Sequence, residues 1–227
     1  MGEKKTIKKI VIIGPESTGK STLCRQLAAH FNTLWCPEYA REYLLKHGTN
    51  YTYDDLLTIA KGQVALEEEY VMRVGSRGSG VQGPGSEVGS PKYNPGLPSS
   101  DSGLPSSDSG LRTSGPGPLL FLDTNMYVMQ VWCEFVFDKC HKYILEQNAS
   151  RKYDLYLLCA TDLPWVKDEL REYPDLESRE RLYKMYKDLL VNQETPWVEI
   201  RGSESDRFHS ALSALSKFAT WQPGDAR

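Results

Sequence analysis

The feature that most constrains this chain is a strand, a glycine loop and a helix that follow one another near residue 14. The segment 10–13 is a short apolar run rich in β-branched residues, and Gly14 and Pro15 end it. The eight residues 14–21, GPESTGKS, fit the pattern G-x-x-x-x-G-K-[ST]. One apolar residue in every four then marks a helix: Leu23, Leu27 and Phe31. This order is the context that a phosphate-binding loop requires.

The residue types of the loop fit that role. Gly14 and Gly19 let the backbone bend its N–H groups around phosphate oxygens, and the N-terminus of the next helix adds further N–H groups. Lys20 can reach the β- and γ-phosphates, and the Ser21 hydroxyl can bind the Mg²⁺ that bridges them. We therefore predict a site for nucleotide phosphates and Mg²⁺, with ATP or GTP as the nucleotide; a glycine turn that only joins strand to helix is the alternative. The predicted nucleotide-binding residues are Gly14, Glu16, Ser17, Thr18, Gly19, Lys20, Ser21 and Thr22.

Composition limits the partners that we expect. The net charge is −3 and the pI about 5.9, so nothing calls for nucleic acid or an anionic membrane. No apolar run approaches the roughly 18 residues of a membrane-spanning helix. The five cysteines have no metal-ligand spacing, and we expect reduced, buried thiols. These features predict a soluble cytoplasmic protein.

Strand-like and helix-like segments alternate along the chain. Further strands are expected at 33–36, 119–122, 155–159 and 197–200. Helices are expected at 39–47, 52–74 and 125–147, with a closing helix around 208–218. This pattern predicts an α/β fold of the P-loop NTPase kind, with a five-stranded parallel sheet, helices on both faces and a lid. Ligands then belong at the carboxyl ends of the strands.

One segment departs from the pattern. Residues 75–118 contain 11 Gly, 11 Ser and 7 Pro, and GLPSSDS occurs twice in succession. Such a composition buries too little apolar surface to offset its chain entropy, which predicts disorder. Because strands and helices resume directly afterwards, we interpret the segment as an insertion within one domain, 1–227. The repeat leaves the origin of the insertion open.

Two carboxylates lie at predicted strand ends. Asp123 follows the apolar run LLFL and fits a Mg²⁺-binding role, while Glu38 fits the role of a base or a hydroxyl-binding group. The two roles are interchangeable at this stage, and an ion pair of Glu38 with Arg41 is the structural alternative. The acidic run 67–69 is expected to be a solvated helix face rather than a metal site.

The segment 161–181 is crowded with arginine. A mobile lid that carries arginine can close over a transferring phosphoryl group and exclude water. Arg171 and Arg179 are the predicted catalytic arginines, and Arg181 is a further candidate. A charged helical hairpin that faces solvent is the alternative.

Several ordered motifs together resemble a known family: GPESTGKSTL, PEYAREYL, YTYDDLLTIAKGQ, FLDTNMYVMQVWCEFVFDKCH, TDLPWVKDELREYPDLESRERLY and LLVNQETPWVEIRG. They are similar to the ribosylnicotinamide kinase domain at the C-terminus of bacterial NadR proteins. The resemblance covers nearly everything outside the insertion and implies transfer of the ATP γ-phosphate to the 5′-hydroxyl of nicotinamide riboside. It implies no adenylyltransferase or repressor activity, because the chain has neither an H-x-G-H motif nor an N-terminal helix-turn-helix region.

Two other functions stay open. One is a kinase for another nucleoside or small metabolite. The other is a nucleotide-hydrolysing switch with a protein partner. The sequence PEYARE and the arginine-rich segment favour an acceptor kinase, and the guanine-reading motif N-K-x-D is absent from the sequence.

Overall fold

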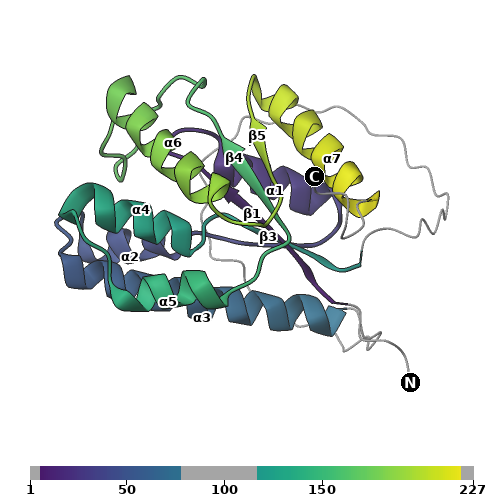
Figure 1. Ribbon diagram of the computed structural model, residues 1–227, viewed down its shortest axis with the longest axis horizontal. Coiled ribbons are helices and arrows are strands. Elements are labelled where there is room, and N and C mark those ends of the chain that lie inside the picture. Colours follow the sequence, from purple (N-terminus) through teal and green to yellow (C-terminus); the bar gives the residue numbers. More distant parts are fainter. Residues whose placement is uncertain (1–5, 78–116, 221–227) are drawn as a thin grey trace.

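The computed structural model describes residues 6–77 and 117–220, and these residues form five strands and seven helices (Figure 1). In chain order the elements are β1 (Lys8–Ile13), α1 (Lys20–His30), β2 (Leu34–Cys36), α2 (Tyr39–His47), α3 (Tyr53–Arg77), β3 (Leu119–Leu122), α4 (Met126–Phe137), α5 (Lys142–Ser150), β4 (Leu155–Cys159), α6 (Leu176–Val191), β5 (Trp197–Ile200) and α7 (Glu204–Thr220). None of these helices is both long enough and apolar enough to cross a membrane.

The five strands form one parallel sheet in the order β2-β3-β1-β4-β5. In the register of the central strand, Val11 of β1 lies beside Leu122 of β3 and Tyr156 of β4. The predicted five-stranded parallel sheet is confirmed. Strands buried on both faces are continuous apolar runs, which is why their positions were predictable from sequence.

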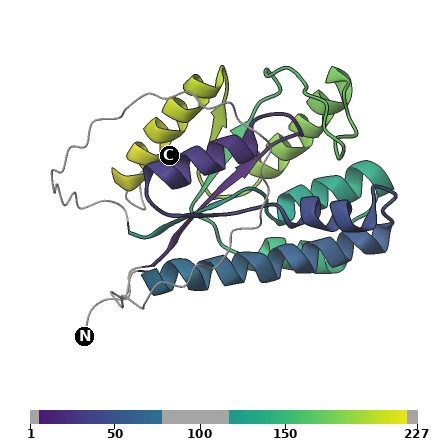
Figure 2. The ribbon, with the colours of Figure 1, turned by 180° about the vertical axis from the view of Figure 1, so that it is seen from behind.

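Alternate residues of the strands face two layers of helices. Ile10 and Ile12 pack against α1 and α7, which lie side by side on one face (Figure 2). Val11 and Ile13 face the other layer, to which α3, α4 and α6 contribute. Full burial of one such side chain is worth about 1.5–3 kcal/mol. The helices on both faces therefore hold the sheet, and with it the loops at its carboxyl edge.

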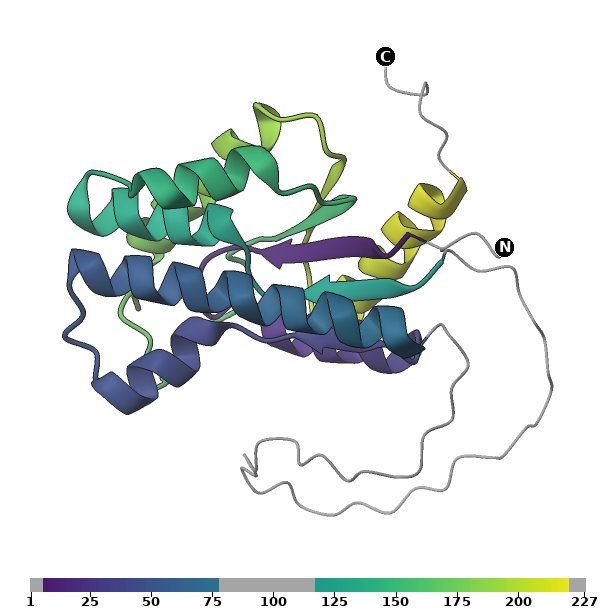
Figure 3. The same cartoon turned by 90° about the horizontal axis from the view of Figure 1, so that it is seen from below.

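A third cluster joins α2, α3, α4 and α5 beyond the carboxyl ends of the strands (Figure 3). Its buried residues include Ala40, Ile59 and Met129. The long helix α3 connects this cluster to the sheet, because it also runs alongside β1 and β3 (Figure 3). A capping box at Thr52 begins α3, with the Asp55 carboxylate accepting from the Thr52 N–H at 2.7 Å. We call these four helices, α2, α3, α4 and α5, the helical wall; they lie at the carboxyl edge of the sheet.

The expected single helix 125–147 is wrong. The chain forms α4 and α5 instead, because Asp138 ends α4 in the left-handed conformation, with φ 52°. His141 then begins α5; its ring stacks on Tyr53 and lies 2.8 Å from the Tyr53 carbonyl oxygen. The apolar spacing continues across this turn, since Cys140 and Ile144 pack on the same cluster as α4. Spacing alone therefore did not reveal the break.

The expected solvated face at 67–69 is wrong for Glu67, which is only 3% exposed. Its carboxylate pairs with Lys9 at 3.0 Å and Arg151 at 3.1 Å, and accepts from the Tyr153 hydroxyl at 3.0 Å. Two cations and a hydroxyl offset the desolvation of the buried carboxylate. Glu67 thereby ties α3 to β1 and to the segment before β4.

Most of the expected insertion lies outside the described residues, since the structure omits 78–116. Helix α3 extends through Arg77, beyond the predicted end at 74. Both ends of the omitted segment adjoin the start of β1: the Lys8 N–H donates to the Pro118 carbonyl at 2.9 Å, and a Cβ on Gly75 would lie 3.7 Å from Ile7. The five cysteines are free thiols, and Cys140 alone of them is not fully buried.

Candidate active site

The phosphate loop, residues 14–19, joins β1 to α1 at the carboxyl edge of the sheet. Gly14 has φ 142°, and a Cβ there would lie 2.5 Å from the Cys159 carbonyl oxygen of β4. Gly19 has φ 79° and precedes the first residue of α1. A side chain at either position would strain the loop. Glycine is therefore required at both ends.

Lys20 begins α1 and turns back over the loop. Its ammonium donates to the Pro15 carbonyl at 2.8 Å, and the Thr18 hydroxyl donates to the same carbonyl at 2.7 Å. Burial raises the pKa values of Asp123 and Glu38, and the charge of Lys20 partly offsets that rise. The structure thus brings Lys20 close to both predicted carboxylates.

Asp123 follows β3 directly and is only 3% exposed. Its N–H donates to the Cys36 carbonyl at 3.0 Å, which ties the end of β3 to the end of β2. Burial raises the pKa of the Asp123 carboxyl to about 7, and the charge of Glu38 adds to the rise. Lys20 and a hydrogen bond with Ser21 act in the opposite direction.

Two buried oxygens at this point have no hydrogen-bond partner among the described residues: Asp123 Oδ1 and Thr124 Oγ1. Thr124 also has φ 143°, which L-residues rarely adopt. Unpartnered buried oxygens are costly, so they point to a ligand at the end of β3.

This donor set fits Mg²⁺, which favours oxygen ligands and is usually held by one or two carboxylates together with substrate phosphates and water. Ser21 and Asp123 supply a hydroxyl and a carboxylate. Within the described ranges no group of three His, Cys, Asp or Glu side chains is placed to hold a metal.

Glu38 follows β2 and immediately precedes α2. Burial raises the pKa of its carboxyl, while the charges of Lys20 and Arg41 lower it and that of Glu16 adds to the rise. Gln63 of α3 fixes this turn, since its side chain accepts from the Tyr39 N–H at 2.7 Å and donates to the Pro37 carbonyl at 3.2 Å. The Arg41 guanidinium is bound to Asp168, at 3.2 and 3.0 Å.

The lid loop, residues 160–175, joins β4 to α6 and lies against the phosphate loop. The Glu16 carboxylate accepts from the N–H groups of Glu172 at 3.1 Å and Tyr173 at 2.9 Å. The Ser17 hydroxyl accepts from the Val166 N–H at 2.9 Å. The lid loop is therefore closed on the phosphate loop in this structure.

The two predicted catalytic arginines both reach Ser17. Arg171 donates to the Ser17 hydroxyl at 3.3 Å and to the Val166 carbonyl. Arg179 is 3% exposed and donates to the carbonyls of Ser17 at 3.5 Å and Leu163 at 3.2 Å, while its Nε is buried without a partner in the described part of the chain. The solvent-facing hairpin is thus excluded for Arg179. Arg181 is exposed and lies over the Phe135 ring instead.

Contacts that sequence reasoning missed connect the lid loop to the helical wall. Beside the Arg41–Asp168 pair, the Tyr51 hydroxyl donates to Glu172 at 2.8 Å and accepts from the Trp132 indole N–H at 2.9 Å.

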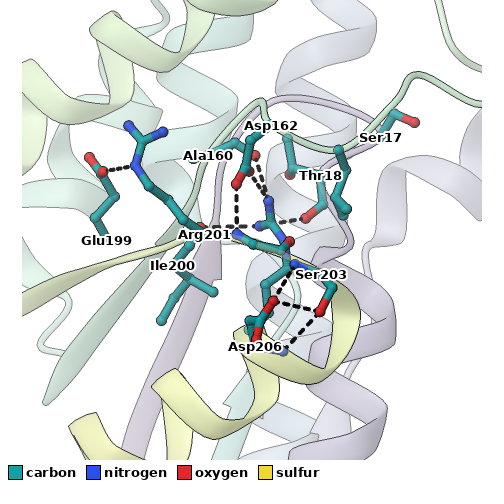
Figure 4. A network of polar contacts seen from close by, with 12 residues as sticks. Ser17, Thr18, Ala160, Asp162, Glu199, Ile200, Arg201, Ser203 and Asp206 are labelled. Atoms are coloured by element: carbon teal, nitrogen blue, oxygen red, sulfur yellow. Dashed lines mark hydrogen bonds and ion pairs between the residues drawn. The ribbon is translucent and has the colours of Figure 1, made fainter.

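A second missed group is Arg207 at the start of α7. The S-x-x-D capping box at Ser203 marks that helix start in the sequence, but nothing local indicates the contacts of Arg207 (Figure 4).

Comparison with known proteins agrees with this arrangement. The family model AAA_28, described as an AAA domain, matches residues 9–79 and 108–207. The trifunctional NAD biosynthesis/regulator proteins NadR of Salmonella typhimurium and Escherichia coli are each 22% identical over 204 residues, which cover 88% of this chain and 40% of theirs. The chain thus spans about two fifths of the length of these curated relatives.

Solved structures show the same fold. A NadR protein in complex with NR superposes with a TM-score of 0.63 at 20% identity, covering 97% of this chain and 52% of that one. The deoxyadenosine kinase of M. mycoides has a TM-score of 0.52 at 11% identity, over 92% of this chain and 99% of that chain. Thymidylate kinase of Ehrlichia chaffeensis has 0.53 at 11% identity, over 93% and 98%. The fold is the P-loop fold of nucleoside and nucleotide kinases.

Proposed function

The chain belongs to the AAA-domain family AAA_28, and from that premise we propose that it is an ATP-dependent kinase of nicotinamide riboside. The product would be nicotinamide mononucleotide. The observation that carries the proposal is the position of Asp123 and Glu38 beside Lys20, at the carboxyl edge of the sheet. Similarity to NadR proteins in sequence and fold supports nicotinamide riboside as the acceptor.

In this proposal the phosphate loop binds ATP. The N–H groups of the loop and of the first turn of α1 hold the phosphates, and Lys20 leaves the Pro15 carbonyl to bind the β- and γ-phosphates. Ser21 and Asp123 would hold a Mg²⁺, whose charge offsets that of the phosphates. Asp123 would stay ionised beside such a cation, although its burial opposes ionisation.

Glu38 is the proposed base. It precedes α2 of the helical wall and lies near enough to Lys20 of α1 and Glu16 of the phosphate loop for their charges to affect its pKa. A raised pKa makes its carboxylate a better acceptor of the proton that the 5′-hydroxyl loses. The charges of Lys20 and Arg41 limit that rise, because they favour the ionised carboxylate.

Arg171 and Arg179 are the proposed lid cations. Both guanidinium groups already contact Ser17 of the phosphate loop, so a small rearrangement brings them to the γ-phosphate. Charge that develops in the transition state would draw them from backbone carbonyls to phosphate oxygens. The closed lid loop would also exclude water and so favour transfer over hydrolysis.

The test is ADP release measured with a panel of acceptors: nicotinamide riboside, deoxyadenosine, thymidine, thymidine monophosphate and none. We expect release to depend on nicotinamide riboside. The fold shared with deoxyadenosine and thymidylate kinases favours a second candidate, a kinase of another nucleoside or of a phosphorylated metabolite, and activity with only one of the other three acceptors would support it. Equal release without acceptor would support an ATPase instead.

A further inference from the structure

Arg207 at the start of α7 donates hydrogen bonds from its side chain to residues of other elements, among them Thr18 and Ala160. Its side chain is among the largest that are fully buried in the described residues, at 2% exposed. All five of its N–H donors have an acceptor, so the guanidinium group is saturated. The acceptors are the carbonyls of Gly202 at 2.9 Å and of Thr18, Ile200 and Ala160 at 3.2 Å each, and the Asp162 carboxylate.

These acceptors come from separate parts of the sheet edge. Ala160 and Asp162 follow β4, Ile200 and Gly202 lie at the end of β5, and Thr18 belongs to the phosphate loop. Asp162 also accepts from the Gly202 N–H at 2.6 Å, which joins the two strand ends directly (Figure 4). Only a planar group with five fixed donors spans such a set, so lysine cannot replace it.

The contact with Thr18 determines the direction of a neighbouring N–H. The peptide bond is planar, and the described residues contain no cis peptide. The Gly19 N–H therefore points away from Arg207 when the Thr18 carbonyl points toward it. Among the described residues this N–H has no hydrogen-bond partner, unlike the Gly19 carbonyl, which accepts from Leu23 at 3.0 Å.

We propose that Arg207 is a positioning residue of the phosphate loop, which holds the Thr18–Gly19 peptide so that the Gly19 N–H is free for a phosphate oxygen. The inference rests on the proposed nucleotide site but not on the identity of the acceptor. Orientation before binding saves the cost of ordering the peptide when the phosphate arrives. Arg207 thus sets nucleotide affinity without touching the nucleotide.

The experiment measures ADP binding by calorimetry, without acceptor, for wild type and Arg207→Lys. We expect the dissociation constant to rise by about 10- to 100-fold. Arg201→Lys is the matched control, because Arg201 is exposed and pairs with Glu199 rather than with the loop. It should bind ADP as wild type does.

The variant Asp162→Asn distinguishes a role of Arg207 in positioning the phosphate loop from a role in the stability of the fold alone. It removes the charge that offsets Arg207 but leaves the Thr18 contact intact, so it should lower the melting temperature and keep ADP affinity within about threefold. Loss of ADP affinity in both variants, in proportion to lost stability, would overturn the proposal. Absence of ADP binding by wild type would overturn the nucleotide site itself, and this inference with it.

A second measurement needs no variant. In the wild-type protein the Gly19 amide proton should shift strongly downfield in the nuclear magnetic resonance spectrum when ADP is added. An unchanged Gly19 resonance at saturating ADP would contradict the proposal, even if no Arg207 variant folds.

Discussion

Glu38 and Asp123 follow the adjacent strands β2 and β3 at the carboxyl edge of the sheet. Burial raises the pKa of Asp123 to about 7, and the charge of Glu38 adds to that rise. An unfolded aspartate titrates near 3.8, so at pH 8 the native state must keep a buried charge that the unfolded state solvates. Without nucleotide, Asp123 therefore costs stability above pH 7. That cost disappears as the pH falls toward 4.

The first prediction follows from the direction of this pKa shift. Asp123→Asn should be more stable than wild type at pH 8, by roughly 1–3 kcal/mol, because it removes a buried charge whose Oδ1 has no hydrogen-bond partner among the described residues. The advantage should shrink between pH 7 and pH 4, as wild-type Asp123 takes up its proton in the native state. Urea unfolding of both proteins at several pH values gives the difference, and a constant difference would contradict the account. The same variant should lose at least about 100-fold in Mg²⁺-dependent turnover.

The second prediction concerns Glu38. Glu38→Gln should lower kcat by about 100-fold or more and leave ATP affinity within threefold, because a base acts on the acceptor and not on the nucleotide. In wild type, kcat should rise with pH through a pKa above the usual range of a glutamate. Full activity of Glu38→Gln would show that Glu38 has no catalytic role.

The third prediction concerns the lid arginines. Arg171→Ala should reduce turnover by about 10- to 100-fold while ADP affinity changes little, as expected for a contact made mainly in the transition state. Arg181→Ala is the control, since that side chain lies over Phe135, away from the phosphate loop. Equal losses of affinity and turnover in Arg171→Ala would point to ground-state binding.

The sequence predicted the strands well and the charged contacts poorly. Three strands have the predicted bounds, while β1 starts two residues earlier and β2 one residue later, because apolar runs identify buried strands. The environment of Glu67 was missed because Lys9 and Arg151 are distant in the sequence. Arg207 was missed for a related reason: most of its acceptors are backbone carbonyls, which no residue type reveals.

The fourth prediction concerns residues 78–116. Because Gly75 and Pro118 both adjoin the start of β1, a short Gly-Ser linker should span the two ends. Loop-closure cost grows by about 0.6 kcal/mol per doubling of length, so the shortened protein should be more stable by about 1–2 kcal/mol with unchanged turnover. Thermal unfolding and ADP release check both parts. A folded deletion variant that has lost activity would show that the segment takes part in the site.

The most direct test of the central claim is identification of the product by ³¹P nuclear magnetic resonance, after incubation with Mg²⁺, ATP and nicotinamide riboside. Lys20→Ala is the inactive control: it should keep its fold, because within residues 6–77 and 117–220 the Lys20 ammonium donates only to the Pro15 carbonyl, and it should lose at least about 100-fold in turnover. Lys46→Ala, an exposed lysine of α2, controls for loss of charge. We predict that wild type and Lys46→Ala form nicotinamide mononucleotide and ADP in equal amounts. ADP with inorganic phosphate and no mononucleotide, or equal product from Lys20→Ala, would contradict the account.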